Sequence, residues 1–129
     1  ILSGGRVICG FVRGIGQESI ATNTNPIYNR ERFEEAHDFL IKAWTTPGPF
    51  RWEGKHYHYR YVNPWVVPMQ KPHPPIWVPG TASRETVQWA ANHRYPYIML
   101  ARDAAQDQEE GMQVQVLFRL GGKFLAYPI

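Results

Sequence analysis

The sequence predicts an α/β fold built on a parallel β-sheet. Three short apolar segments have the composition of strands, at residues 7–12, 76–78 and 97–100. Two segments with helical spacing of their apolar residues, 30–44 and 84–93, lie between them. Strands that alternate with helices form parallel sheets with right-handed crossovers. We therefore expect the three strands to be parallel neighbours, with both helices on the outer face of the sheet.

The first predicted strand, Val7–Val12, is a nearly continuous apolar run. Such a run is typical of a strand that is covered on both faces. Ser3-Gly4-Gly5 precedes it as a turn, and Arg13–Gly16 follows it as a loop that the polar residues 17–25 extend. The glycines of this loop lack a third glycine in register, so they do not form a dinucleotide-binding fingerprint.

The first predicted helix spans Arg30–Trp44. Asn29 is its expected N-cap, and Pro47-Gly48-Pro49 ends it. We expect His37 and the acidic residues beside it to lie on a solvent-exposed face. Apolar residues recur at helical spacing along the opposite face: Phe33, Ala36, Leu40, Ala43 and Trp44.

The alternating residues Phe50–Val62 predict a β-hairpin with its turn at Glu53-Gly54. His56 and His58 are expected on one face of the hairpin, a spacing that suits a metal ion. No third ligand of the right kind is near in sequence, so we predict no metal site. Three tyrosines are expected to share the other face and to pack against the body of the protein: Tyr57, Tyr59 and Tyr61.

A candidate anion site follows the second predicted strand, Ile76–Val78, which is expected to stop at Pro79-Gly80. Small hydroxyl residues come next, and a helix then begins with Arg84 in its first turn. Backbone N–H groups at a helix N-terminus lack intrahelical partners and attract anions. The candidate phosphate-binding residues are Gly80, Thr81, Ser83 and Arg84. In the alternative interpretation, Ser83 merely caps an ordinary helix.

Arg13 is a second candidate for the same ligand. It lies at the carboxyl end of the first predicted strand, and in α/β proteins ligands collect at the carboxyl ends of parallel strands. If the first two strands are neighbours, Arg13 and the turn at residues 80–84 converge. Two N–H-rich or cationic loops suit a dianionic phosphate better than one.

The second predicted helix has Val87, Ala90 and Ala91 on one side, and His93 and Arg94 favour its carboxyl end. A short apolar strand, Tyr97–Leu100, follows. Beyond it, residues 101–111 are polar, and two apolar runs, at 112–120 and 124–129, flank Gly121-Gly122 as in a hairpin.

The composition narrows the classes of function. The chain has 129 residues, a formal net charge of +3 and scattered basic residues, which argues against nucleic acid as a partner. No apolar run approaches the ~20 residues of a membrane span, and no signal peptide is recognisable, so we expect a soluble cytoplasmic protein. The single cysteine, Cys9, excludes an internal disulfide and is expected to be a small buried apolar side chain.

Several short motifs follow one another in order between Ile1 and about Leu100. They are Ser3-Gly4-Gly5-Arg6 with Gly10-Phe11-Val12-Arg13-Gly14, Arg32-Phe33-Glu34-Glu35, Trp44, Glu53-Gly54, and Pro74-Pro75-Ile76-Trp77-Val78 before a Gly-x-x-Ser helix start. Together these motifs resemble the bacterial luciferase-like monooxygenases.

This resemblance implies a partial (β/α)8 TIM barrel, covering about strands four to six with their helices and an inserted β-hairpin. Residues 1–100 would form the barrel fragment, and 101–129 a divergent tail. The first three and last two strands of the barrel would be missing. A truncated or frameshifted reading of the gene would account both for the abrupt start of the chain and for its divergent tail.

The resemblance also implies a function, that of a flavin-dependent monooxygenase acting with reduced FMN and oxygen on a small organic substrate. Arg13 would contact the flavin phosphate, and the turn at residues 80–84 would complete that site. The sequence shows no nucleophile–base pair, so no catalytic residue is named, and the fragment alone is expected to be inactive.

The alternatives are a deazaflavin-dependent dehydrogenase of the same family, and a non-catalytic barrel paralogue or assembly subunit. The expected partners are the flavin, the substrate, a flavin reductase that supplies reduced flavin, and a second subunit in a homo- or heterodimer.

Overall fold

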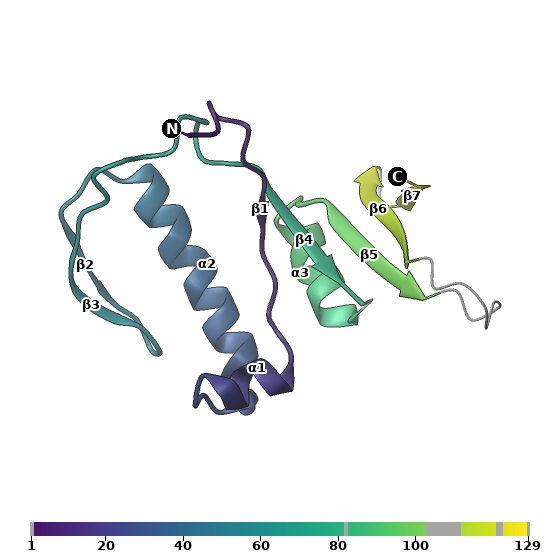
Figure 1. The fold of residues 1–129 in the computed structure, drawn as a ribbon, viewed down its shortest axis with the longest axis horizontal. Helices are drawn as coiled ribbons and strands as arrows, with labels where there is room; N and C mark the ends of the chain where they lie inside the picture. Colours follow the sequence, from purple (N-terminus) through teal and green to yellow (C-terminus); the bar gives the residue numbers. More distant parts are fainter. Residues whose placement is uncertain (1, 82, 103–111, 121–122, 129) are drawn as a thin grey trace. The chain divides into compact units, whose positions relative to one another are not determined.

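The computed structural model describes residues 2–81, 83–102, 112–120 and 123–128. The chain divides into two compact units (Figure 1). The first, here called the hairpin unit, comprises Ile1–Val7 and Arg13–Pro74; the second, the sheet unit, comprises Ile8–Val12 and Pro75–Ile129. Two segments that are distant in sequence therefore meet in one sheet.

The described strands of the sheet unit lie in the order β1-β4-β5-β6-β7 (Figure 1). β1 pairs with β4, and β4 with β5, in parallel; β6 pairs antiparallel with both β5 and β7. This confirms the predicted parallel neighbours and the hairpin suggested for the tail. The bounds are β1 (Cys9–Gly10), β4 (Ile76–Gly80), β5 (Tyr97–Arg102), β6 (Met112–Leu120) and β7 (Lys123–Pro128).

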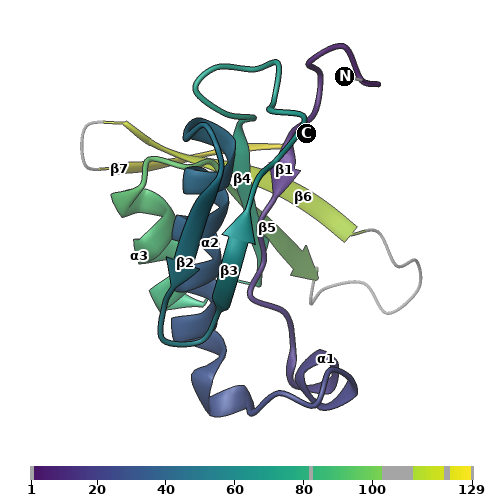
Figure 2. The same ribbon diagram turned by 90° about the vertical axis from the view of Figure 1, so that its left-hand side faces the viewer.

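Helix α3 (Arg84–Asn92) packs on one face of this sheet and forms its core with β4 and β5 (Figure 2). Val78, Ala90 and Tyr97 are buried between the helix and the strands, and Trp89 stacks on Phe11 with ring centroids 6.2 Å apart. The helix ends as predicted, because the His93 Nδ1–H donates to the carbonyl of Trp89 over 2.9 Å.

Strand β4 continues through Pro79 and Gly80, where the sequence suggested that it stops. Pro79 pairs with Ile98, and Gly80 with Met99. Alternate residues of a strand bond to opposite neighbours, and Trp77 bonds to the β1 side. The backbone of Pro79 is turned toward the β1 side too, but β1 pairs with β4 only as far as Trp77. No described strand is therefore paired there, and the N–H that proline lacks costs no hydrogen bond between strands.

Strand β1 is much shorter than predicted. It lies at one edge of the described sheet, and only Cys9 and Gly10 pair with β4. Val7, Ile8 and Val12 are exposed, so the prediction that this apolar run is covered on both faces is wrong for the chain as described. With β4 alone beside it, the strand has a hydrogen-bonding partner on one side only.

The hairpin unit contains a helix that the sequence did not predict. Helix α1 (Gly16–Ala21) replaces the predicted loop, and a 3₁₀ helix, η1 (Pro26–Tyr28), follows it. The Glu18 carboxylate accepts from the N–H of Ile15 over 2.8 Å and so stabilises the start of α1. Gly14, with φ of 80°, makes the sharp turn into this helix.

Helix α2 (Asn29–Thr45) confirms the predicted helix, but its N-cap is Tyr28 rather than Asn29. Asn29 lies inside the helix, and its Nδ2 donates to Ser19 Oγ over 2.6 Å. Asn25 caps η1 instead, accepting from the N–H of Ile27. The expected position of this helix on the outer face of the sheet stays a prediction.

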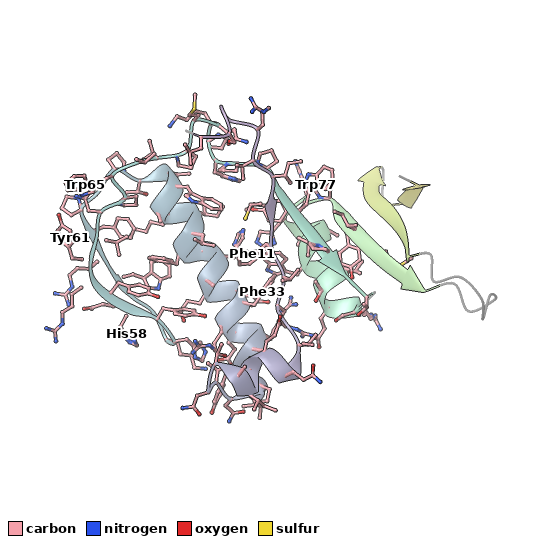
Figure 3. The ribbon with its side chains drawn as sticks, in the orientation of Figure 1. Phe11, Phe33, His58, Tyr61, Trp65 and Trp77 are labelled. Atoms are coloured by element: carbon pink, nitrogen blue, oxygen red, sulfur yellow. The ribbon has the colours of Figure 1, made fainter. Side chains whose placement is uncertain are left out.

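The predicted β-hairpin is formed by β2 (Phe50–Glu53) and β3 (His58–Val62), which pair antiparallel beside α2 (Figure 2). Phe39 of α2 packs against the rings of Trp52 and Tyr59, with centroids 5.5 and 5.0 Å away. Tyr61 differs from the prediction, because it is 68% exposed and points away from α2 (Figure 3).

Candidate functional site

The turn between β4 and α3 brings together four of the five predicted phosphate-binding residues. Gly80 ends β4, Thr81 and Ser83 lie in the turn, and Arg84 is the first residue of α3. Thr81 and Arg84 are exposed, and Ser83 is half-buried. The structure therefore places hydroxyl and guanidinium groups around the N-terminus of a helix, at the carboxyl end of a parallel strand.

Ser83 occupies the N-cap position but does not cap the helix with its side chain. Its backbone is extended, with φ of −60° and ψ of 118°, and its carbonyl accepts from the N–H of Val87 over 2.9 Å. Its hydroxyl makes no capping hydrogen bond, which corrects the alternative interpretation from the sequence. The N-terminus of α3 is thus not closed by its own N-cap side chain.

The side-chain charges in the first turn of α3 balance each other. Arg84 and Glu85 are adjacent and both exposed. An anion at this end would therefore be drawn mainly by the N–H groups and the positive end of the helix dipole. Arg84 could still turn toward a ligand as a fork of donors.

Gly80 has a packing role that the sequence did not reveal. A Cβ placed on Gly80 would lie 2.5 Å from the hydroxyl oxygen of Tyr97 and 3.2 Å from its Cζ. Tyr97 is 2% exposed, so its ring has little room to move aside. The glycine is therefore required by the sheet core, whether or not an anion binds above it.

Arg13 belongs to the hairpin unit, whereas the turn belongs to the sheet unit. The part that Arg13 plays at the turn stays a prediction. Within the sheet unit, β1 runs parallel to β4, so these two strands end at the same edge of the sheet.

Sequence reasoning missed a second group of interacting residues, which we call the Glu31–Glu35 clasp. The Glu35 carboxylate accepts hydrogen bonds from Trp52 Nε1–H over 3.0 Å and from the N–H groups of His56 and Tyr57 over 2.7 and 3.0 Å. Glu31, one turn earlier on α2, accepts from Lys55 Nζ over 2.6 Å and from His56 Nε2 over 2.8 Å. The hydrogen bonds of the clasp connect the hairpin turn to α2.

The electrostatics of the clasp favour ionised carboxylates. Hydrogen bonds from Lys55 and then His56 hold the pKa of Glu31 below its ordinary value. Burial alone would raise the pKa of Glu35, but its three hydrogen bonds outweigh that effect and lower the pKa. The prediction that the acids beside His37 lie on a solvent-exposed face is therefore wrong for Glu35. It is also wrong for His37, which is buried.

The clasp left a weak signal in the sequence. Glu31 and Glu35 are four residues apart on a helix and so share one face, and the hairpin turn carries Lys55 and His56. Because opposite charges on two adjacent elements also occur by chance, this pattern alone does not predict contact.

The two histidines considered for a metal do not act as a pair. His56 lies before β3 and bonds to Glu31, whereas His58 is exposed on β3 (Figure 3). Within the residues that the structure covers, no group of three or more His, Cys, Asp or Glu side chains is arranged to hold a metal ion. Burial raises the pKa of the Cys9 thiol, which disfavours its reactive thiolate form.

Comparisons with known proteins found a matching family model, a similar protein sequence and a similar solved structure. The model of the family described as luciferase-like monooxygenase matches residues 1–122. An uncharacterized protein, y4wF, of Sinorhizobium fredii (strain NBRC 101917 / NGR234) is 33% identical over 93 residues, which cover 71% of this chain and 27% of that protein. The crystal structure of monooxygenase RslO1 from Streptomyces bottropensis matches with a TM-score of 0.63 and 28% identity.

The chain spans only a part of these relatives. The match with RslO1 covers 74% of this chain and 29% of the other. Among the residues described, no helix is both long enough and apolar enough to cross a membrane.

Proposed function

Because this chain belongs to the luciferase-like monooxygenase family, we propose that it supplies the phosphate-binding part of a flavin-dependent monooxygenase. That enzyme would use reduced FMN and oxygen to oxidise a small organic substrate. The observation that carries the proposal is the β4–α3 turn, where the N-terminus of α3 is not capped by Ser83 and Thr81 and Arg84 are exposed.

The residues of the turn fit the phosphate end of FMN. The hydroxyl groups of Thr81 and Ser83 are hydrogen-bond donors, and Arg84 carries a planar fork of N–H groups that matches a phosphate. Arg13, which follows β1 in sequence, would add a second guanidinium. When bound, reduced flavin supplies the electrons for the reaction with oxygen, and the protein supplies binding, orientation and exclusion of water.

A charge placed at Thr81 tests this proposal directly. Thr81 is exposed, so the turn tolerates a longer side chain there, whereas any side chain at Gly80 would collide with Tyr97. In the protein containing this chain, Thr81→Glu should weaken FMN binding at least about tenfold by repulsion, with little effect on riboflavin, which lacks the phosphate. Thr81→Gln, the neutral control of equal size, should retain most FMN affinity.

The comparison of the two flavins separates the outcomes. Equal loss of FMN and riboflavin would indicate general damage to the fold. Unchanged FMN affinity in Thr81→Glu would mean that no phosphate binds at this turn, and the proposal would fail.

Arg13 is tested by its own pair of variants. If it contacts the phosphate, Arg13→Ala should weaken FMN binding by roughly 1.5–3 kcal/mol, the range for a hydrogen bond to a charged group. Arg13→Lys restores the charge without the planar fork and should recover only part of the affinity. Titration calorimetry that finds wild-type affinity in both variants would remove Arg13 from the site.

Turnover assays distinguish the reaction types within the family. Oxygen-dependent conversion of the substrate to an oxygenated product with reduced FMN, absent when the protein is left out, supports the monooxygenase. Substrate-dependent reduction of a deazaflavin without oxygen consumption would assign a dehydrogenase instead. Tight flavin binding with neither reaction would indicate a non-catalytic paralogue.

A further inference from the structure

The side chain of Tyr97 lies close to Gly80, the residue at which the candidate phosphate-binding turn begins. Tyr97 begins β5 and pairs with Val78, two residues before Gly80 on β4. Residues two apart on a strand share one face, so the Tyr97 ring extends along that face toward Gly80. Its hydroxyl oxygen would lie 2.5 Å from a Cβ on residue 80.

Position 80 requires glycine because of this contact and not because of its backbone conformation. The φ angle of Gly80 lies outside the left-handed region, so any residue could adopt its backbone conformation. What excludes a side chain is the phenol of Tyr97, which is held between α3 and the sheet with Val78 and Ala90. The phenol therefore occupies the space that a side chain of residue 80 would need.

We propose that Tyr97 is a positioning residue for the phosphate of the flavin. Its phenol packs against Gly80, the last residue of β4. This contact fixes the positions of Thr81, Ser83 and the first turn of α3. This inference rests on the proposed function, because it assigns Tyr97 to the same phosphate site. Tyr97 touches neither the phosphate nor the reacting atoms and acts through the backbone of Gly80.

The two residues should show coupled effects on phosphate binding. Gly80→Ala forces a methyl group against the hydroxyl of Tyr97 and should displace the turn. The affinity for FMN should fall about tenfold relative to that for riboflavin, as expected for an overpacked core site. In the double variant Gly80→Ala/Tyr97→Phe the hydroxyl is gone, and the nearest remaining ring atom, Cζ, lies 3.2 Å from the new Cβ. Most of the loss should therefore be recovered.

The experiment measures the ratio of FMN affinity to riboflavin affinity, and the melting temperature, in the protein containing this chain. Tyr97→Phe alone should lower the ratio a few-fold, because the turn loses its support. Tyr95→Phe is the matched control: Tyr95 follows α3 at its other end, against Trp89 and His93, and its variant should keep the wild-type ratio.

The outcomes separate this inference from the proposed function. A wild-type protein that binds FMN no better than riboflavin would refute the phosphate site, and the role of Tyr97 with it. A wild-type preference for FMN that stays unchanged in Gly80→Ala and Tyr97→Phe would overturn the inference alone, even if the melting temperature falls. Should Gly80→Ala fail to fold, the ratio in Tyr97→Phe decides.

Discussion

Single carboxylates in this chain have very different structural roles, which their positions in sequence do not reveal. Glu34 and Glu35 are adjacent on α2. Glu34 pairs with Arg30 one turn away at the surface, over 2.6 Å, whereas Glu35 accepts three hydrogen bonds from the hairpin. Only the fold of the hairpin back onto α2 distinguishes the two, so a local pattern could not predict the clasp.

Glu35→Ala should therefore destabilise the chain far more than Glu34→Ala. Loss of the Glu35 carboxylate leaves the Trp52 indole and the N–H groups of His56 and Tyr57 without their acceptor. We expect the free energy of unfolding to fall by about 2–3 kcal/mol, against about 0.5 kcal/mol for the exposed pair of Glu34. Urea denaturation of both variants checks this, and equal effects would show that the hydrogen bonds of Glu35 add no more stability than the surface pair of Glu34.

Ser83 is the opposite case: in the structure, its side chain contributes less to stability than its N-cap position predicts. A serine N-cap usually contributes about 1 kcal/mol to stability through its side-chain hydrogen bond. Because Ser83 makes no such bond, Ser83→Ala should change the free energy of unfolding by only a few tenths of a kcal/mol. A loss near 1 kcal/mol in thermal or chemical unfolding would mean that the hydroxyl caps α3 in solution.

At the scale of elements, the parts that local patterns specify were predicted well. Helix α2, the β2–β3 hairpin and the parallel strands β4 and β5 lie where apolar spacing and turn residues placed them. Helix α1 was missed because its polar residues show no apolar period, and it is stabilised instead by Glu18 at its start. The extent of β1 was overestimated because pairing depends on neighbours that composition does not specify.

The candidate site was predicted in the same uneven way. The strand–turn–helix pattern placed Gly80, Thr81, Ser83 and Arg84 at one turn, as the structure has them. Two aspects of the site could not be foreseen from this local pattern. One is the support from Tyr97, which comes from the next strand, and the other is the missing cap at Ser83.

The turn of the hairpin should detach from α2 in acid. The pKa of Glu31 and that of Glu35 are both lowered in the folded chain. These carboxylates therefore stabilise the fold fully above the pKa of glutamate in the unfolded chain, about 4.3. That stabilisation is lost as the pH falls through their lower pKa values in the folded chain. Facing them are Lys55, His56, Trp52 and Tyr57. The pH dependence of unfolding should flatten in this range in the Glu31→Gln/Glu35→Gln double variant, and an unchanged profile would contradict the assignment.

Gly54 links the clasp to the geometry of the hairpin. A Cβ on Gly54 would overlap Oε1 of Glu35 and would lie 2.8 Å from Nε1 of Trp52. Gly54→Ala should therefore cost about 1–3 kcal/mol by overpacking, with a smaller effect when Glu35 is already alanine. Equal costs in the two backgrounds, measured by a double-mutant cycle, would show that the glycine matters for another reason.

For the whole molecule, the distribution of exposed apolar residues has a consequence for solution behaviour. Around β1, at the edge of the described sheet, Ile8 and Val12 are 51% and 56% exposed. An edge strand with apolar neighbours can pair with another chain, and exposed apolar side chains stabilise such pairing. The same residues are thus available to pair with a second copy of the chain.

Residues 1–129 expressed alone should therefore self-associate in a concentration-dependent way. Ile8→Lys and Val12→Lys place charges beside the unpaired edge and should shift the chain toward monomer, because an incoming strand would have to bury them. Ile20→Lys is the control: Ile20 is 77% exposed on α1, in the other unit, and its variant should associate like the wild type. Sedimentation velocity over a tenfold or wider range of concentration measures the equilibrium. A wild-type chain that stays monomeric, or three lysine variants that behave alike, would show that the β1 edge does not drive association.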